Sequence, residues 1–410
     1  MTALYGNAIV GQSGGPTAAI NATLAGVIRG VLASRATIPT LYGMRNGVEG
    51  LLGERLVDLT AIFAADEDAI STLEDTPAAA LGSCRYKLPK PDADRATFDK
   101  ILEIFKKYDI RYFFYIGGND SMDAVAKLSA YLETVDYEMR VIGVPKTIDN
   151  DLVGTDHTPG FGSAAKYIAT TIKEIIRDCA VYTIPAVTVV EIMGRDAGWL
   201  TASAALAALT GEGPDLIYLP ERDFSLEQFF TDVKAALARH PNVVVAVSEG
   251  IRFADGTYVG ASAQSGAVDT FGHAYLAGTG KFLESAVKSE IGCKVRAVEL
   301  NLPQRCAAHL ASATDIEESV RTGKTAVSAA ISGVSGHMMT AVRTDAPYRV
   351  EISSSPVSAI ANMVKTVPDA YINDMGNGIT EAGLAYLAPL IVGERAPKFE
   401  CGMPKHFVLS

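Results

Sequence analysis

Residues Tyr112–Ser121 have the sequence YFFYIGGNDS, which indicates the class of fold more directly than any other stretch of the chain. The first five residues are aromatic or β-branched and apolar on both faces, as in a strand buried inside a parallel sheet. Two glycines and three polar residues follow, and residues 121–132 have the apolar spacing of a helix. The stretch therefore predicts a strand, a glycine-rich turn and a helix in succession.

The same order recurs along the chain. Further short apolar runs predict buried strands at residues 7–11, 141–144, 186–192 and 243–247. Helical patterns lie between or after them, at residues 18–32, 96–108, 162–179, 199–209, 226–238 and 267–291. Strands that alternate with helices form parallel sheets, and such sheets bind ligands at the carboxyl ends of their strands. We therefore expect an α/β fold with mainly parallel sheets sandwiched by helices, and a site built from the glycine-rich turns.

Composition narrows the classes of partner. The chain has 410 residues, with 36 Lys plus Arg against 47 Asp plus Glu, so its formal net charge is −11. This length suggests two or three domains. The acidic balance disfavours nucleic acid and anionic membranes as partners, because both attract a basic face. Small anionic substrates remain compatible, since charge is screened over about 10 Å at 0.1 M salt and a few local cations outweigh the total.

Cysteine usage and the N-terminus bear on the compartment. The five cysteines are scattered and form no C-x-x-C pair, which is typical of reduced thiols rather than disulfides or a zinc site. No stretch has the roughly 18 apolar residues of a membrane span, and the first residues do not have the pattern of an export signal. We therefore expect a cytoplasmic protein.

Four turns follow predicted strands and carry residues suited to anions. Gly14 and Gly15, in a turn that we expect to open a helix, would let backbone N–H groups approach a phosphate. A plain strand-to-helix turn is the alternative. The only Gly-Lys-Thr, at residues 323–325, lacks the earlier glycine of a P-loop and lies inside a helical pattern, so we expect it to be structural.

The second turn is Gly117–Ser121, the end of the stretch quoted above. Its carboxylate, Asp120, is placed as an oxygen ligand for Mg²⁺. The alternative is a helix cap formed by Asp120 and Ser121.

The third turn, Pro145–Asp151, has the sequence PKTIDND. In an extended chain Thr147, Asp149 and Asp151 would share a face and Lys146 would point to the other. Two carboxylates beside a hydroxyl suit deprotonation of a substrate alcohol, and the neighbouring cation suits a phosphoryl group. An Asp- and Asn-rich turn without chemistry is the alternative.

The fourth turn, Met193–Trp199, contributes Arg195, whose guanidinium suits bidentate binding of a phosphate monoester. A surface salt bridge between Arg195 and Asp196 is the alternative. Glu249 stands at the end of another predicted strand, and Arg296 and Arg305 are spaced nine residues apart.

In this order, the motifs resemble those of the phosphofructokinase family over about residues 7–315. The matching segments are SGGPTAAIN (13–21), LGSCR (81–85), GGNDS (117–121), PKTIDND (145–151), VVEIMGR (189–195), SEG (248–250) and R-x₈-R (296–305). The resemblance implies two Rossmann-like domains and phosphorylation of fructose 6-phosphate at its 1-hydroxyl, a step of glycolysis and gluconeogenesis.

The resemblance also assigns roles to residues. It implies that Asp149 is the catalytic base, with Lys146, Asp120 and Thr147 beside it. The phosphoryl donor would be bound by Gly14, Gly15, Arg85, Gly118 and Lys146. The sugar phosphate would be bound by Thr147, Asp149, Asp151, Met193, Gly194, Arg195, Glu249, Arg296, Gln304 and Arg305. Arg296 would reach in from a neighbouring subunit, which implies a homodimer or homotetramer.

Two positions indicate the donor. ATP-using members typically have GGDGS and a small residue before TIDND, whereas this chain has Asp120 and Lys146 at those places. The pair resembles the pyrophosphate-dependent branch, and a carboxylate at the place of an ATP α-phosphate would repel a nucleotide. An ATP-dependent enzyme, a pyrophosphate-dependent kinase that also accepts sedoheptulose 7-phosphate, and a non-catalytic sugar-phosphate-binding protein are the alternatives.

The resemblance implies Mg²⁺, but the usual Asp ligand is replaced here by Asn119, so the ligand is either Asp120 or Asn119 through water. The expected domains are residues 1–155 with about 306–350 for the donor and about 156–305 for the sugar phosphate. Residues from about 351 to 410 form a C-terminal extension in which we recognise no motif.

Overall fold

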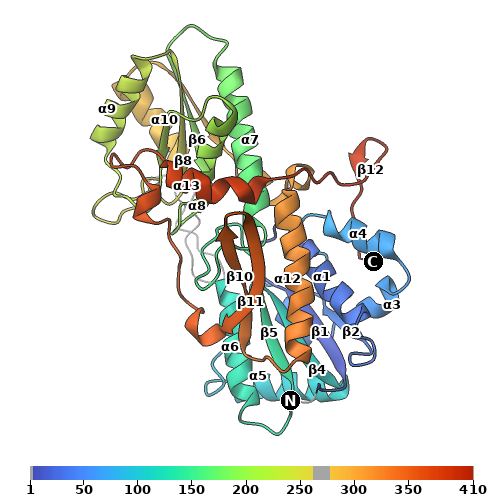
Figure 1. Ribbon diagram of the computed structural model, residues 1–410. Helices are drawn as coiled ribbons and strands as arrows, with labels where there is room; N and C mark the ends of the chain where they lie inside the picture. The colour runs from blue at the N-terminus through green and yellow to red at the C-terminus, as the bar shows by residue number, and fades with distance from the viewer. Residues whose placement is uncertain (1–2, 262–277, 410) are drawn as a thin grey trace.

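The computed structural model describes residues 3–261 and 278–409. Two large β-sheets, each covered by helices, lie one above the other, and the chain passes between them several times (Figure 1). A two-stranded antiparallel sheet near the C-terminus, β12 (Phe399–Glu400) and β13 (Met403–Pro404), is separate from both. The expected α/β architecture with mainly parallel sheets is confirmed.

The larger sheet has the strand order β11-β10-β5-β4-β1-β2-β3. Its strands are β1 (Asn7–Gln12), β2 (Leu41–Met44), β3 (Leu56–Asp58), β4 (Ile110–Gly117), β5 (Arg140–Pro145), β10 (His337–Asp345) and β11 (Tyr348–Pro356). The inner pairs are parallel, while β3 and β11 are antiparallel edge strands. β4 is buried along almost its whole length because helices cover both faces, which explains its continuous apolar run.

The smaller sheet is wholly parallel, with the order β7-β8-β6-β9. Its strands are β6 (Ala186–Ile192), β7 (Leu216–Tyr218), β8 (Asn242–Ser248) and β9 (Lys294–Glu299). β6 begins and ends where the sequence predicts.

The helices are α1 (Ile20–Leu32), α2 (Gly47–Leu52), α3 (Leu59–Phe63), α4 (Glu67–Glu74), α5 (Arg95–Lys107), α6 (Asn119–Leu132), α7 (Phe161–Cys179), α8 (Trp199–Ala202), α9 (Leu226–Leu237), α10 (Thr279–Glu290), α11 (Pro303–Cys306), α12 (Ala313–Ile331) and α13 (Glu381–Leu387). The helix predicted at 199–209 is α8 for one turn and then continues as a 3₁₀ helix, Ser203–Thr210. Of the helix predicted at 267–291, only the part from Thr279 onward is observed, and residues 267–277 lie outside the described residues.

Two glycines bring α1 and α12 into close contact. A Cβ atom on Gly26 would lie 2.1 Å from the carbonyl oxygen of Val320, and one on Gly323 would lie 2.2 Å from that of Thr23. No side chain fits at either position, so both helices pack backbone against backbone. The structural role predicted for the Gly-Lys-Thr at 323–325 is confirmed.

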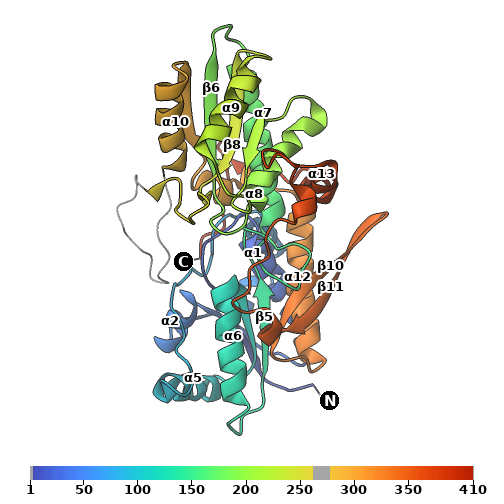
Figure 2. The ribbon, with the colours of Figure 1, turned by 90° about the vertical axis from the view of Figure 1, so that its left-hand side faces the viewer.

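The C-terminal extension contacts both sheets. β11 continues to Pro356, so the extension begins a few residues after the expected boundary at 351. It then passes beside α6 and α8, forms α13 next to the smaller sheet, and returns to α4 (Figures 1 and 2). At that end Arg395 binds Asp75 at 2.6 Å and the Phe407 ring lies 5.0 Å from that of Phe63.

Candidate active site

A cavity of about 460 Å³ lies between the two sheets, at the carboxyl ends of β1, β4, β5, β6 and β8. Most of the predicted site residues line it, namely Gly14, Gly15, Arg85, Gly118, Asn119, Asp120, Lys146, Thr147, Asp149, Asp151, Met193, Arg195, Glu249 and Arg305. This is the position expected for a ligand site in a parallel sheet. The structure thus brings together turns that lie up to about 290 residues apart in the sequence.

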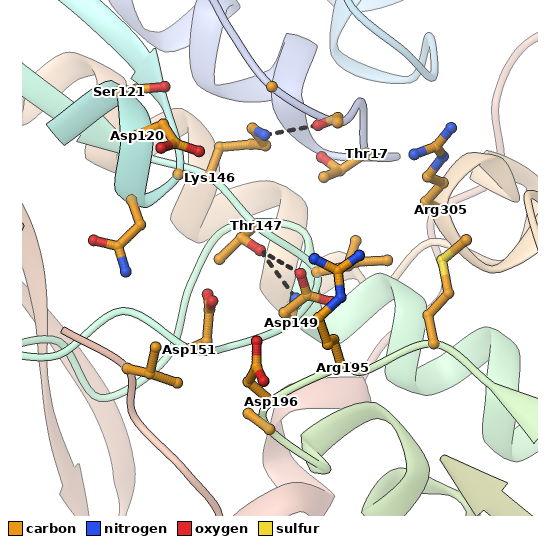
Figure 3. Close-up of a pocket in the computed structure, with 18 of the residues that line it drawn as sticks. Thr17, Asp120, Ser121, Lys146, Thr147, Asp149, Asp151, Arg195, Asp196 and Arg305 are labelled. Atoms are coloured by element: carbon orange, nitrogen blue, oxygen red, sulfur yellow. Dashed lines mark hydrogen bonds between the residues drawn. The ribbon is translucent and has the colours of Figure 1, made fainter. Parts of the chain in front are cut away.

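The turn after β1 forms one end of the cavity. Gly14 has a φ of 78°, which favours glycine, and its carbonyl accepts a hydrogen bond from Ser83 Oγ at 2.6 Å. The Lys146 ammonium donates a hydrogen bond to the Gly15 carbonyl of this turn at 2.7 Å (Figure 3). Because α1 begins only at Ile20, the glycines do not open the helix as expected, so an anion here would meet loop N–H groups and a lysine.

The turn after β4 contributes Asp120. α6 begins at Asn119 with Gly118 as its cap residue, and no side chain caps it, so the alternative of an Asp120–Ser121 cap is not formed. Asp120 lies in the first turn of α6 and faces the cavity close to Lys146 (Figure 3). The Asp120 carboxylate and the Lys146 side chain therefore line the same cavity.

Asn119 has a different set of partners from the one expected. Its amide nitrogen donates to the Met363 carbonyl at 2.7 Å, and its amide oxygen accepts the Asn362 N–H at 2.8 Å. Both ends of the amide are used to hold the C-terminal extension. This leaves Asp120 as the better placed of the two proposed Mg²⁺ ligands.

The turn after β5 brings its polar side chains to one place. Thr147 Oγ1 accepts the Asp149 N–H at 3.1 Å and lies 3.4 Å from Asp149 Oδ2 (Figure 3). The backbone of Asn150 is in the left-handed conformation, with a φ of 53°. The expectation of an extended chain with Lys146 on the opposite face is wrong, because the chain turns here and Lys146 lines the same cavity as the two aspartates.

Burial and mutual charge shift the ionisation of this cluster. Burial raises the pKa of Asp149, while the charge of Lys146 acts in the opposite direction. Burial, together with the charge of Asp149, raises the pKa of Asp151 to about 7. Burial lowers the pKa of Lys146 to about 8. A carboxylate with a raised pKa is a stronger base than an ordinary aspartate, as proton abstraction from an alcohol requires.

Two arginines from different elements also line the cavity. Arg195 comes from the turn between β6 and α8, and Arg305 comes from α11 (Figure 3). A Cβ atom on Gly15 would lie 3.4 Å from Arg305 Nη1, so this arginine also borders the turn after β1. The geometry suits a phosphate monoester held near the aspartates.

Backbone contacts fix the turn that carries Arg195. Glu249 Oε1 accepts the Gly194 N–H at 3.2 Å, and burial raises the pKa of Glu249 to about 7. Gln304 does not line the cavity but accepts the Met193 N–H at 3.2 Å, so it supports the turn from behind. The alternative, a salt bridge between Arg195 and Asp196, is not observed. Asp196 pairs with Arg252 instead.

Arg296 does not line this cavity in the chain that carries it. It stands on β9 beside Thr188 of β6, in a small hollow that also includes Asp178 and Tyr182. Its expected role therefore depends on a second copy of the chain.

Sequence reasoning missed the contribution of the extension. Asn362 and Val364 line the cavity, and neither belongs to a motif. No local signal could have indicated them: the α6 residue that binds the Asn362 N–H, Asn119, lies more than 200 positions earlier.

Among the residues that the structure describes, no three His, Cys, Asp or Glu side chains are grouped to hold a metal ion. Magnesium commonly takes one or two protein carboxylates and completes its shell with phosphate oxygens and water. A cavity lined by the Asp120 carboxylate fits that mode of binding. No described helix is long and apolar enough to cross a membrane.

Comparisons with known proteins agree with this geometry. A family profile described as Phosphofructokinase matches residues 7–330. The pyrophosphate–fructose 6-phosphate 1-phosphotransferase of Xanthomonas campestris is 44% identical, over 99% of this chain and 96% of its own length. That of Halomonas elongata is 42% identical, over 97% and 95%. The crystal structure of a pyrophosphate-dependent phosphofructokinase from Nitrosospira multiformis superposes with a TM-score of 0.88 at 39% identity, covering 98% of this chain and 95% of that one.

Proposed function

Because this chain belongs to the phosphofructokinase family, we propose that it reversibly phosphorylates the 1-hydroxyl of fructose 6-phosphate with pyrophosphate as donor. The observation that carries the choice of donor is the position of Lys146, which donates a hydrogen bond to the Gly15 carbonyl in the turn after β1. Asp120 lines the same part of the cavity, and we call this part the donor end. The names of the relatives at 42–44% identity support the same activity and not the ATP-dependent alternative.

The donor end suits a compact anion. The Lys146 ammonium can neutralise charge on the phosphate that leaves, at a site only 3% exposed to solvent, where electrostatic attraction is weakly screened. Asp120 would place a negative charge against a longer, nucleotide-bearing donor and repel it. Pyrophosphate needs no base pocket, so this exclusion does not hinder its binding.

The chemistry follows from the turn after β5. Asp149 accepts the proton of the 1-hydroxyl, whose oxygen attacks the nearer phosphorus of pyrophosphate. The bridging P–O bond breaks, and inorganic phosphate leaves beside Lys146. Thr147 Oγ1, 3.1 Å from the Asp149 amide, fixes the orientation of this turn. The reverse reaction uses the same groups, since the protonated Asp149 returns its proton to the sugar oxygen.

Magnesium is the metal that we propose, with Asp120 as its protein ligand. When bound, it would neutralise the charge of pyrophosphate and align the donor for in-line transfer. Asp151 lies on the same turn as Asp149 and lines the same cavity.

Arg195 and Arg305 bind the 6-phosphate, and we propose that Arg296 of a second copy completes that end in a homodimer or homotetramer. All five cysteines are free, which fits a reducing cytoplasm. A looser pocket would also admit sedoheptulose 7-phosphate. Comparison of kcat/KM for the two sugars tests this, and a preference of about a thousandfold for fructose 6-phosphate would exclude it.

The choice of donor is tested by the double substitution Asp120→Gly with Lys146→Gly. We expect the variant to lose pyrophosphate-dependent activity and to gain ATP-dependent activity relative to the wild type. A variant that keeps its preference for pyrophosphate would contradict the roles of these two residues. A non-catalytic binding protein would show no turnover with either donor in the wild type.

A further inference from the structure

The C-terminal extension forms one edge of the cavity, through a short segment, residues 362–367. Asn362 and Met363 are bound by Asn119 at the start of α6, as described above. Five residues later, the Val367 N–H donates to Glu221 Oε1 at 2.9 Å, next to the smaller sheet. The segment therefore spans from one domain to the other directly beside the turn that carries the catalytic base.

Lys365 is the residue of this segment that contacts the catalytic turn. Its ammonium donates to Asn150 Oδ1 at 3.2 Å, to the Thr155 carbonyl at 3.2 Å and to the Asp156 carbonyl at 2.6 Å. A lysine ammonium has three protons to donate, so these contacts use all of them. The Lys365 N–H also donates to the Asp151 carbonyl at 2.7 Å.

The main chain and stem of Lys365 are held from the side of the smaller sheet. The Trp199 indole N–H donates to the Lys365 carbonyl at 2.9 Å, and the ammonium lies 5.3 Å from the centre of the Trp199 ring. Both the backbone and the ammonium of Lys365 are therefore held in place. Trp199 of α8 binds its carbonyl, and the catalytic turn binds its ammonium.

Asn150 is the residue of the catalytic turn whose side chain the extension binds. It is fully buried, left-handed, and placed between Asp149 and Asp151. Its amide nitrogen donates to the Tyr386 hydroxyl at 3.2 Å, and that hydroxyl donates to the Asp156 carbonyl at 2.7 Å. After glycine, asparagine is among the residues that adopt a left-handed backbone most readily, because its short polar side chain can form local hydrogen bonds. At Asn150 the side chain instead binds partners from outside the turn, so the position of that side chain depends on them. Here both side-chain partners of Asn150 come from the extension.

We propose that Lys365 is a positioning residue for the phosphoryl transfer, which holds Asn150 in its left-handed conformation so that Asp149 and Asp151 face the substrates. The inference rests on the proposed function. Burial lowers the pKa of Lys365 to about 8, and the nearby carboxylates of Asp156 and Asp151 favour its charged form. A cation in this environment binds neutral oxygens more strongly than a neutral donor would.

The first test is Lys365→Met, which keeps the stem and removes the three donated hydrogen bonds. We expect kcat to fall about 10- to 100-fold, while KM for fructose 6-phosphate and for pyrophosphate stays within about threefold, because the phosphate-binding arginines are untouched. Lys398→Met is the matched control, since Lys398 belongs to the same extension but pairs with Asp68 on α4. The control should keep wild-type kcat. A Lys365→Met kcat within about twofold of the wild type would overturn the proposal.

A double-mutant cycle separates positioning from general stability. If Lys365 acts through Asn150, then Lys365→Met should cost little further kcat once Asn150→Ala has removed its side-chain partner. Losses that multiply in the double variant would overturn the proposal. Rates are measured with whichever donor the wild type uses, so a wild type that prefers ATP would contradict the proposed function without affecting this comparison.

Tyr386→Phe covers the case in which the lysine variant does not fold. It removes a single hydroxyl that binds the same asparagine and the same carbonyl. We expect kcat to fall about three- to tenfold with both KM values preserved. An unchanged kcat in this variant, or a fall matched by an equal rise in KM, would overturn the proposal.

Discussion

Lys146→Met is the substitution that most sharply tests how the donor is bound. It removes the cation from the donor end and keeps an unbranched apolar stem. The ammonium lies 2.7 Å from the Gly15 carbonyl on a side chain only 3% exposed, so solvent screens its charge weakly. A unit charge about 4 Å from a phosphoryl oxygen is worth roughly 4 kcal/mol at an effective dielectric constant of about 20. Water and metal replace part of this, so we expect kcat/KM for pyrophosphate to fall about 10²- to 10³-fold.

The pH dependence of the same variant gives a second measure. Lys146 keeps its charge below a pKa of about 8 and loses it as the pH rises through that value, so wild-type kcat/KM should decline near pH 8. Lys146→Met should lack this alkaline decline. Because the charge of Lys146 lowers the pKa of Asp149, the acid limb of the variant should move to higher pH.

The assay is the initial rate of fructose 1,6-bisphosphate formation from about pH 6 to about pH 9, at several pyrophosphate concentrations. Lys234→Met serves as the control, because Lys234 is an exposed residue of α9 that pairs with Glu290 at 3.0 Å. A Lys146→Met variant with kcat/KM within about threefold of the wild type and an unchanged pH profile would refute the reasoning.

Three further substitutions test the other groups of the site. Asp149→Asn should lower kcat about 10²- to 10⁴-fold and leave fructose 6-phosphate binding, measured by calorimetry, within about threefold; a kcat loss under about tenfold would exclude Asp149 as the base. Arg305→Lys should raise KM for fructose 6-phosphate about tenfold, since lysine cannot make a bidentate contact with phosphate, and an unchanged KM would contradict that contact. Gly250→Ala would place a Cβ atom 2.0 Å from the Arg195 carbonyl, so urea denaturation should show a loss of about 1–3 kcal/mol in unfolding free energy, and wild-type stability would contradict this steric argument.

The inner strands could be predicted from the sequence because burial on both faces leaves a clear pattern. β4 is largely and β6 mostly apolar, and both were located to within two residues. β9 was not among the predicted strands, because three of the six residues in its sequence, KVRAVE, are charged and the edge strand is partly exposed. β3 and β7 are three residues each, too short to produce a periodic signal.

The sequence could predict which residues lie at the site where those residues directly follow a predicted strand. Asp120, Lys146 and Asp149 stand at strand ends, and parallel strands bring those ends together. The geometry within the turn after β5 could not be predicted, because the left-handed Asn150 depends on contacts with Lys365 and Tyr386. Those contacts join residues more than 200 positions apart, and pairings at such separations leave no trace in a single sequence.

The extension shows why a segment without motifs can still form part of a site. Its hydrogen bonds to the catalytic turn are made by Lys365 and by the Tyr386 hydroxyl, and two single residues form no recognisable sequence pattern. Its role follows only from the three-dimensional contacts.

The most direct test of the account is the rate of fructose 1,6-bisphosphate formation by the wild-type protein with magnesium, measured with pyrophosphate, with ATP and without a donor. The positions of Lys146 and Asp120 predict rapid turnover with pyrophosphate, little with ATP, and none without a donor. A wild-type protein that uses ATP in preference to pyrophosphate would contradict the central claim.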